Sequence, residues 1–221
     1  MNPSLDHIHW LGHDSFRIDG QGAVIYIDPW HLQDGPAADI ILITHDHHDH
    51  CSPEDVAKIR KADTVILTTQ EAAGKLPAPV QVIRPGEEQV VKGVTVRAVP
   101  AYNTNKFRSP GQHFHPREKN HVGFVVTVDG TIIYHTGDAD PIPEMAGLKV
   151  DVALLPVSGT YVMTVAEAVQ AAQMIQPKVA IPMHVGAGIG AIEMAEEFRA
   201  QAAAALPGLT VVVLPLEGAP S

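Results

Sequence analysis

The feature that most constrains this chain is a short buried strand that runs directly into a cluster of histidines. Residues 39–44 form a nearly continuous apolar run, which is the pattern of a strand covered on both faces. The next six residues, 45–50, are four histidines and two aspartates. Ser52 and Pro53 then predict a capped helix start. The histidine segment is therefore expected to be held at both ends by regular structure.

The rest of the chain begins with strands and ends with alternating strands and helices. A hairpin is expected from strands at 8–18 and 23–27 around a turn at 20–22. After the histidine segment, the next strands are expected at 64–69, 80–83 and 89–100. A second hairpin joins 122–128 to 131–135, and strands at 150–157, 179–183 and 210–214 alternate with helices at 165–175 and 191–206. Residues 102–120 show neither period and are expected to form one long loop. This order predicts an α/β (α+β) fold of two mixed sheets with helices outside, in a single domain spanning 1–221.

Composition excludes several classes of protein. The chain has 221 residues with 45% apolar types and a formal net charge of −10, so we expect a folded domain without broad attraction to nucleic acid or anionic membranes. Cys51 is the single cysteine, which excludes an internal disulfide framework and a cysteine-based zinc site. We find neither a signal peptide nor a membrane span and expect a cytoplasmic protein. A homo-oligomer is left open.

Histidines and aspartates follow the ends of several predicted strands. His45, Asp138, the Ser158 loop and His184 all have this position, and such loops can converge on one rim of a sheet. Imidazole and carboxylate ligands suit Zn²⁺, Mn²⁺, Fe²⁺ or Ni²⁺, and the lack of thiolates favours a catalytic over a structural centre. The sequence therefore predicts a metal site of one or two ions, the two lying about 3.5–4 Å apart.

The pattern His-x-His-x-Asp-His at 45–50 resembles the metallo-β-lactamase superfamily. Further matching pieces lie at residues 12–16 (Gly-His-Asp-Ser-Phe), 27–29, 134–138 and 181–184. Within the superfamily, the chain is most similar to small metal-dependent hydrolases, the branch that also holds L-ascorbate-6-phosphate lactonase. The resemblance implies a four-layer αββα sandwich.

The resemblance also implies a ligand set. His45 and His47 would bind the first metal, and Asp138 would bridge to the second. The second metal would take Asp49, His50 and His184. The third histidine of the first metal is assigned to His115, with His113 and His121 as alternatives.

Several neighbouring residues are expected to support this set without binding metal. His13 and His135 are interpreted as hydrogen-bonded core or supporting histidines. Asp28 is expected to brace the metal loop as a hydrogen-bond acceptor, and Asp140 to cap residues 141–142.

These parts predict a hydrolase that uses a metal-activated water on a small ester, lactone or phosphoester. Zn²⁺ is the expected cofactor, with Mn²⁺, Fe²⁺ or Ni²⁺ as alternatives. Asp49 is expected to shuttle a proton, Asp138 to act as the bridging carboxylate, and Tyr161 to donate a hydrogen bond to the substrate. The loop 102–120 carries four cationic side chains against one glutamate, which favours an anionic small-molecule substrate.

Three other functions remain open. The fold can host an iron-dependent thiol dioxygenase, although His47 stands where flavin-linked di-iron relatives carry Glu. A nucleic-acid phosphodiesterase is disfavoured by the acidic balance. A metal-retaining binding protein is the non-catalytic alternative.

Overall fold

Strand β4 (Ala38–Ile43), which leads into the histidine segment, is covered on both faces. The computed structural model describes residues 3–186 and 188–217. Ile40 and Leu42 join an apolar cluster that draws on both sheets, whereas Ile41 and Ile43 pack with Val56 of the next helix. Because side chains alternate along a strand, both faces are buried at once. The buried strand predicted from the apolar run is confirmed.

The first sheet has six strands in the order β1-β2-β3-β4-β5-β6. Its first three strands pair antiparallel, and β3 to β6 pair parallel. The other strands of this sheet are β1 (Ile8–Gly12), β2 (Ser15–Asp19), β3 (Val24–Ile27), β5 (Arg60–Thr68) and β6 (Gln81–Val82).

The second sheet has seven strands in the order β15-β14-β13-β12-β11-β8-β7. The β11–β12 hairpin pairs antiparallel with β8, while β12 to β15 run parallel. The strands of this sheet are β7 (Glu88–Val91), β8 (Val94–Pro100), β11 (Val122–Val128), β12 (Thr131–His135), β13 (Val152–Pro156), β14 (Val179–Met183) and β15 (Thr210–Val211).

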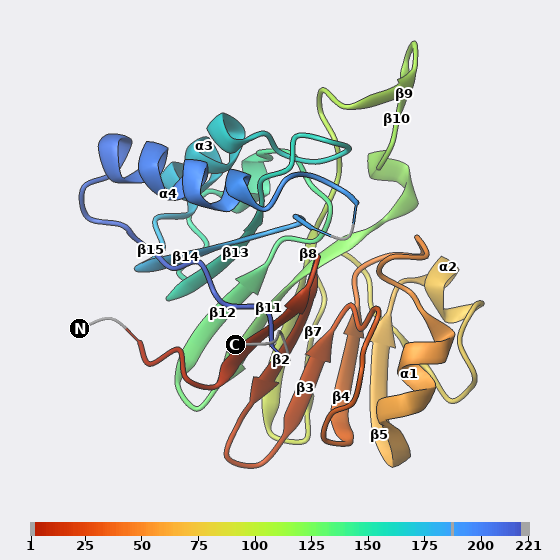
Figure 1. Cartoon of the computed structure of the whole chain (residues 1–221). Helices are drawn as coiled ribbons and strands as arrows, with labels where there is room; N and C mark the ends of the chain where they lie inside the picture. Colours follow the sequence, from red (N-terminus) through yellow and green to blue (C-terminus); the bar gives the residue numbers. More distant parts are fainter. Residues whose placement is uncertain (1–2, 187, 218–221) are drawn as a thin grey trace.

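Helices cover the outer faces of the two sheets, which gives the four αββα layers expected from the sequence (Figure 1). Helices α1 (Pro53–Ile59) and α2 (Gln70–Ala73) lie beside β5, whereas α3 (Val165–Ile175) and α4 (Glu193–Ala205) lie over β13 and β14. Helix α3 begins with the predicted Thr164–Glu167 capping box. No helix within the described residues is long and apolar enough to cross a membrane.

The expected single strand over residues 8–18 is wrong, because the chain reverses at His13 and Asp14. Gly12 (φ 107°) and His13 (φ 52°) have left-handed backbones, and Trp10 pairs with Phe16 across the turn. Gly12 has no Cβ and adopts this conformation readily. The reversal puts His13 and Asp14 at the tip of a hairpin rather than inside a strand.

The expected long loop at 102–120 contains regular structure. Strands β9 (Phe107–Ser109) and β10 (Gln112–His113) form a hairpin that projects from the body of the protein (Figure 1). Gly111, with φ 76°, lies in the turn between them. A 3-10 helix η1 (Arg117–Lys119) follows, and a second, η2 (Pro143–Met145), lies after β12. The hairpin strands are too short to show a period in the sequence.

A charge cluster at the base of the fold ties the two sheets together and gives a testable pH dependence. Asp39 accepts hydrogen bonds from the Val24 amide at 2.9 Å and from Lys61 at 2.6 Å, and Lys92 of the β7–β8 turn lies 3.3 Å away. The hydrogen bond from Lys61, with that from Val24, lowers the pKa of Asp39 to about 2. Because the pKa is lowered, the stabilisation is present above the ordinary value of 3.8 and is lost as the pH falls towards 2.

We expect Asp39→Asn to lower the free energy of unfolding at pH 7 by about 1 kcal/mol, because it removes only the charge. The difference from wild type should shrink between pH 4 and pH 2. Urea unfolding followed by circular dichroism measures both, with Asp34→Asn as the control, since Asp34 is exposed and lies outside the charge cluster. A difference that stays constant over this pH range would contradict the assignment.

Candidate metal centre

The ends of strands from both sheets bring the candidate ligands together. His45 follows β4, Asp138 follows β12, and His184 follows β14. Gly137, between β12 and Asp138, has φ 60°, and a Cβ there would lie 2.9 Å from the Val122 carbonyl oxygen. Only glycine lets the loop of Asp138 approach this closely. The convergence on one rim expected from the sequence is confirmed.

A first group of side chains that could hold a metal ion consists of His45, His47, His115 and Asp138. One ligand atom from each lies within 4.8 Å of the others. The Nδ1 atom of His47 is 3.0 Å from Nε2 of His45 and 3.2 Å from Nε2 of His115. His115, the residue assigned as third histidine of the first metal, therefore lies in one group with His45 and His47, and its ligand role stays a prediction. Its alternatives His113 and His121 lie outside this group.

A second group consists of His13, Asp14, His50 and His184, again within 4.8 Å of one another. All four are almost completely buried. Both carboxylate oxygens of Asp14 and the Nε2 atoms of His50 and His184 have no hydrogen-bond partner among the described residues. Buried polar atoms without partners cost free energy, so their convergence points to a cation that satisfies them.

Asp138, a member of the first group, also faces the second. Its Oδ2 atom is 3.2 Å from Nε2 of His115 and 3.6 Å from Nε2 of His184, and its Oδ1 atom is 3.3 Å from Nε2 of His50. The Nε2 atom of His45 is 3.9 Å from Oδ2. One carboxylate thus faces both groups, the arrangement that a bridging ligand requires.

Four imidazoles are oriented by a hydrogen bond at Nδ1, so that the Nε2 atom of each faces Asp138. Oxygens of four side chains contact the Nδ1 atoms: Asp28 with His50 at 2.7 Å, Thr44 with His45 at 2.9 Å, Asn103 with His115 at 3.0 Å and Ser158 with His184 at 2.8 Å. An acceptor at Nδ1 fixes the proton there and leaves Nε2 free to bind a metal.

Asp28 braces the histidine segment as the sequence predicted. It accepts hydrogen bonds from the amide and the hydroxyl of Thr44 at 2.8 and 2.6 Å and also contacts His50. One carboxylate therefore holds both ends of this segment.

His135 is also confirmed as a core histidine, with Nε2 2.9 Å from the Asp14 carbonyl oxygen.

Asp140 does not cap residues 141–142, as expected, but anchors the loop that carries Asn103. Its Oδ2 atom accepts hydrogen bonds from the amides of Thr104 and Asn105 at 2.6 and 2.9 Å. Asn103 in turn accepts from the backbone and ring nitrogens of His115. The sequence analysis missed Asn103, because its partner His115 is twelve residues away and no local pattern joins them.

The electrostatics of the centre favour positive charge next to Asp138. Burial would raise the pKa of this carboxyl, but the charges of His50 and His184 hold it well below its usual value. Burial, followed by the charge of His115, lowers the pKa of His47 to about 4, so His47 is neutral and can act as a ligand. A divalent cation would supply the positive charge that these groups stabilise.

Comparison with known proteins identifies the family. The family model for beta-lactamase superfamily domains matches residues 7–184. The chain belongs to the metallo-β-lactamase superfamily. It is 30% identical to a UPF0173 metal-dependent hydrolase of Caldivirga maquilingensis over 95% of both chains. It is 34% identical to a second such hydrolase, of Thermoplasma acidophilum, over 80% of this chain and 82% of that one.

A solved structure agrees with this placement in the superfamily. The crystal structure of a protein from Parabacteroides distasonis, also named as a metal-dependent hydrolase, matches with a TM-score of 0.82 and 34% identity. The match covers 95% of this chain and 93% of that one. This metallo-β-lactamase-fold protein is therefore a metal-dependent hydrolase. The narrower resemblance to L-ascorbate-6-phosphate lactonase stays a prediction.

Two residues of the second group were not expected there. His13 was interpreted as a supporting residue, and Asp14 was quoted only as part of the Gly-His-Asp-Ser-Phe match at 12–16. The expected ligand Asp49 is adjacent but outside the group, with Oδ2 3.2 Å from Nε2 of His13 and 3.9 Å from Nε2 of His50. The adjacent polar residues His13 and Asp14 were the sequence signal that could have predicted their place in this group. The ligand role of Asp49 stays a prediction.

We expect Asn103→Ala to weaken metal binding about 10- to 100-fold, because His115 loses the acceptor that orients it. Competition with a chelator of known affinity, read by elemental analysis, measures the change. Asn105→Ala on the same loop is the matched control, since its side chain binds Glu167 rather than a histidine. Equal metal affinity in the two variants would contradict the positioning role.

Proposed function

We propose that this hydrolase cleaves a small anionic ester, lactone or phosphoester next to Asp138. A cavity of about 320 Å³ opens on the metal centre, with Asp49, Asp138 and Tyr161 in its wall. Arg108 and Phe114 also line it and belong as well to a neighbouring cavity of about 440 Å³. This volume suits a small molecule rather than a polymer.

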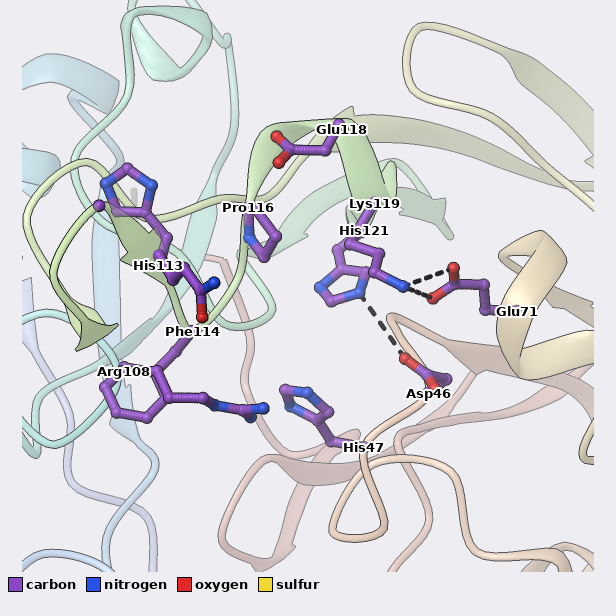
Figure 2. Close-up of a pocket in the computed structure, with 12 residues that line it drawn as sticks. Asp46, His47, Glu71, Arg108, His113, Phe114, Pro116, Glu118, Lys119 and His121 are labelled. Carbon is purple, nitrogen blue, oxygen red and sulfur yellow. Dashed lines mark hydrogen bonds and ion pairs between the residues drawn. The ribbon is translucent and has the colours of Figure 1, made fainter.

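The unpaired charge of Arg108 is the observation that carries the proposal of an anionic substrate. Three of the four cationic side chains of residues 102–120 are paired within the protein, namely Lys106 with Glu167, Arg117 with Glu144 and Lys119 with Glu71. Arg108 makes no ion pair with a described residue and lies over the Phe114 ring at 5.7 Å. Its guanidinium points towards His47 (Figure 2). An anion in the cavity would give it a partner.

Arg108 and Asp49 have different roles in the proposed hydrolysis. Bound divalent cations would polarise the scissile bond and lower the pKa of a water molecule. Arg108 holds the anionic group of the substrate. Asp49 takes a proton from the attacking water and delivers it to the leaving oxygen. Burial would raise the pKa of Asp49, but its hydrogen bond with His13 lowers it, so the carboxylate is ionised and ready to accept.

We propose that Tyr161, in the wall of the same cavity, contacts the substrate. Its side chain packs edge-on against Phe114, with ring centroids 4.7 Å apart, and the residue is 42% exposed. Its carbonyl oxygen accepts a hydrogen bond from Asn103, so the residue is fixed relative to His115. We propose that its hydroxyl donates a hydrogen bond to the developing oxyanion.

We propose Zn²⁺ as the metal, in two ions per chain, because imidazole and carboxylate ligands without thiolates suit a catalytic zinc site. Mn²⁺, Fe²⁺ and Ni²⁺ suit the same ligands. Asp138 belongs to the first four-residue group and also faces His50 of the second, which supports two ions rather than one.

Elemental analysis tests this proposal. We expect about two zinc ions per wild-type chain, and His47→Ala should lose metal and nearly all activity towards phosphoesters and lactones, because the first group loses a ligand. His9→Ala is the matched control, since His9 pairs with Asp19 and Glu217 and lies outside both ligand groups and the cavity. A single iron with oxygen consumption would favour the thiol dioxygenase instead. Tight RNA binding at physiological salt would favour the phosphodiesterase.

Arg108→Ala should raise KM for an anionic substrate about ten-fold or more, because a charge-assisted hydrogen bond is lost. The KM of a neutral analogue should change little. Arg117→Ala is the control, because it removes the same charge from the same loop while its guanidinium is held by Glu144 at 2.8 Å. Steady-state kinetics on both substrates give the comparison, and equal effects of the two variants on the anionic substrate would refute the role of Arg108.

A further inference from the structure

A third set of potential ligands, Asp46, Glu71 and His121, lies beside the metal centre and belongs to neither of its two groups. One ligand atom from each lies within 4.8 Å of the others. The three residues come from different segments of the chain: the segment after β4, helix α2 and the residue before β11. Figure 2 shows them on one wall of the 440 Å³ cavity. We propose that this set binds a third divalent transition-metal cation.

His121 is the residue that distinguishes this set from an ordinary surface charge cluster. Its side chain is only 4% exposed, yet neither ring nitrogen has a hydrogen-bond partner among the described residues. Its Nε2 atom faces Oδ1 of Asp46 at 3.7 Å, too far for a hydrogen bond (Figure 2). A buried imidazole without a partner pays a desolvation cost that a metal ion between it and the carboxylates would offset.

The two carboxylates keep enough capacity to bind a cation. Asp46 uses Oδ2 to pair with Lys75 at 2.7 Å, which leaves Oδ1 towards His121. Glu71 pairs with Lys119 at 2.7 and 3.0 Å, but both side chains are more than 40% exposed. Exposed ion pairs of this kind contribute little to stability, so a cation can displace Lys119 at small cost.

One imidazole and two carboxylates form a donor set that suits Zn²⁺, Mn²⁺, Co²⁺ or Ni²⁺. The first group lies close by, with the ring centroids of His121 and His45 4.8 Å apart. Because the third cation would lie nearer to solvent and beside other positive charge, we expect it to bind more weakly than the ions next to Asp138. It would add positive charge to the wall of the cavity that Arg108 also lines.

Isothermal titration of the metal-loaded protein with Zn²⁺ tests the site. We expect wild type to bind one further ion after its tight sites are full. Glu71→Gln should weaken this step at least about ten-fold, because a ligand is lost. Lys119→Ala should strengthen it, because the competitor for Glu71 is removed. A change of net charge near the cavity predicts the same two signs, so a charge control that removes no ligand is also needed.

Glu118→Gln is the matched control, because Glu118 lines the same cavity but lies outside the ligand set. It should bind the further ion as wild type does. The proposal is overturned by the absence of a further ion in wild type, by unchanged binding in Glu71→Gln, by weaker binding in Lys119→Ala, or by an equal loss in Glu118→Gln. The tight sites are counted separately in the same titration, so their failure is distinguishable.

Discussion

The centre depends on one buried carboxylate, Asp138, towards which the Nε2 atoms of four imidazoles point. A buried carboxylate costs several kcal/mol unless opposite charge and hydrogen-bond donors compensate for it. Here the imidazoles are themselves buried, and their outer nitrogens are occupied by neighbouring oxygens. Cations held by Asp138 and the imidazoles would satisfy both requirements, because they would neutralise the carboxylate and use the free nitrogen lone pairs.

The two sheets supply this arrangement from opposite sides. The first sheet delivers the histidine segment through β4, and Asp28 ties its two ends together. The second sheet delivers Asp138 and His184 from the ends of parallel strands, and the loop after β8 adds His115 through Asn103. Packing of the sheets therefore determines the distance between the ligand groups. The function follows from this packing, since neither sheet alone contains a complete group.

The local part of this account could be predicted from the sequence, and the non-local part could not. The strand into His45, the capping box at Thr164 and the Asp28 brace all follow from short patterns or from the family resemblance. Asp14 was missed because residues 8–18 were interpreted as one strand, although the chain reverses after Gly12. Three of the four cationic side chains of residues 102–120 pair with residues far away in the chain, which leaves Arg108 unpaired among the described residues. The sequence shows four cationic side chains at residues 102–120 and does not distinguish them. Among them, only Arg108 has no ion-pair partner in the described part of the chain.

The most direct test of the central claim is a crystal structure of the metal-loaded protein with anomalous scattering collected at the metal absorption edge. The account predicts two anomalous peaks, one on each side of Asp138, the first among His45, His47 and His115 and the second among His13, Asp14, His50 and His184. A single peak, or peaks that leave the Asp138 carboxylate without a bound metal, would contradict it.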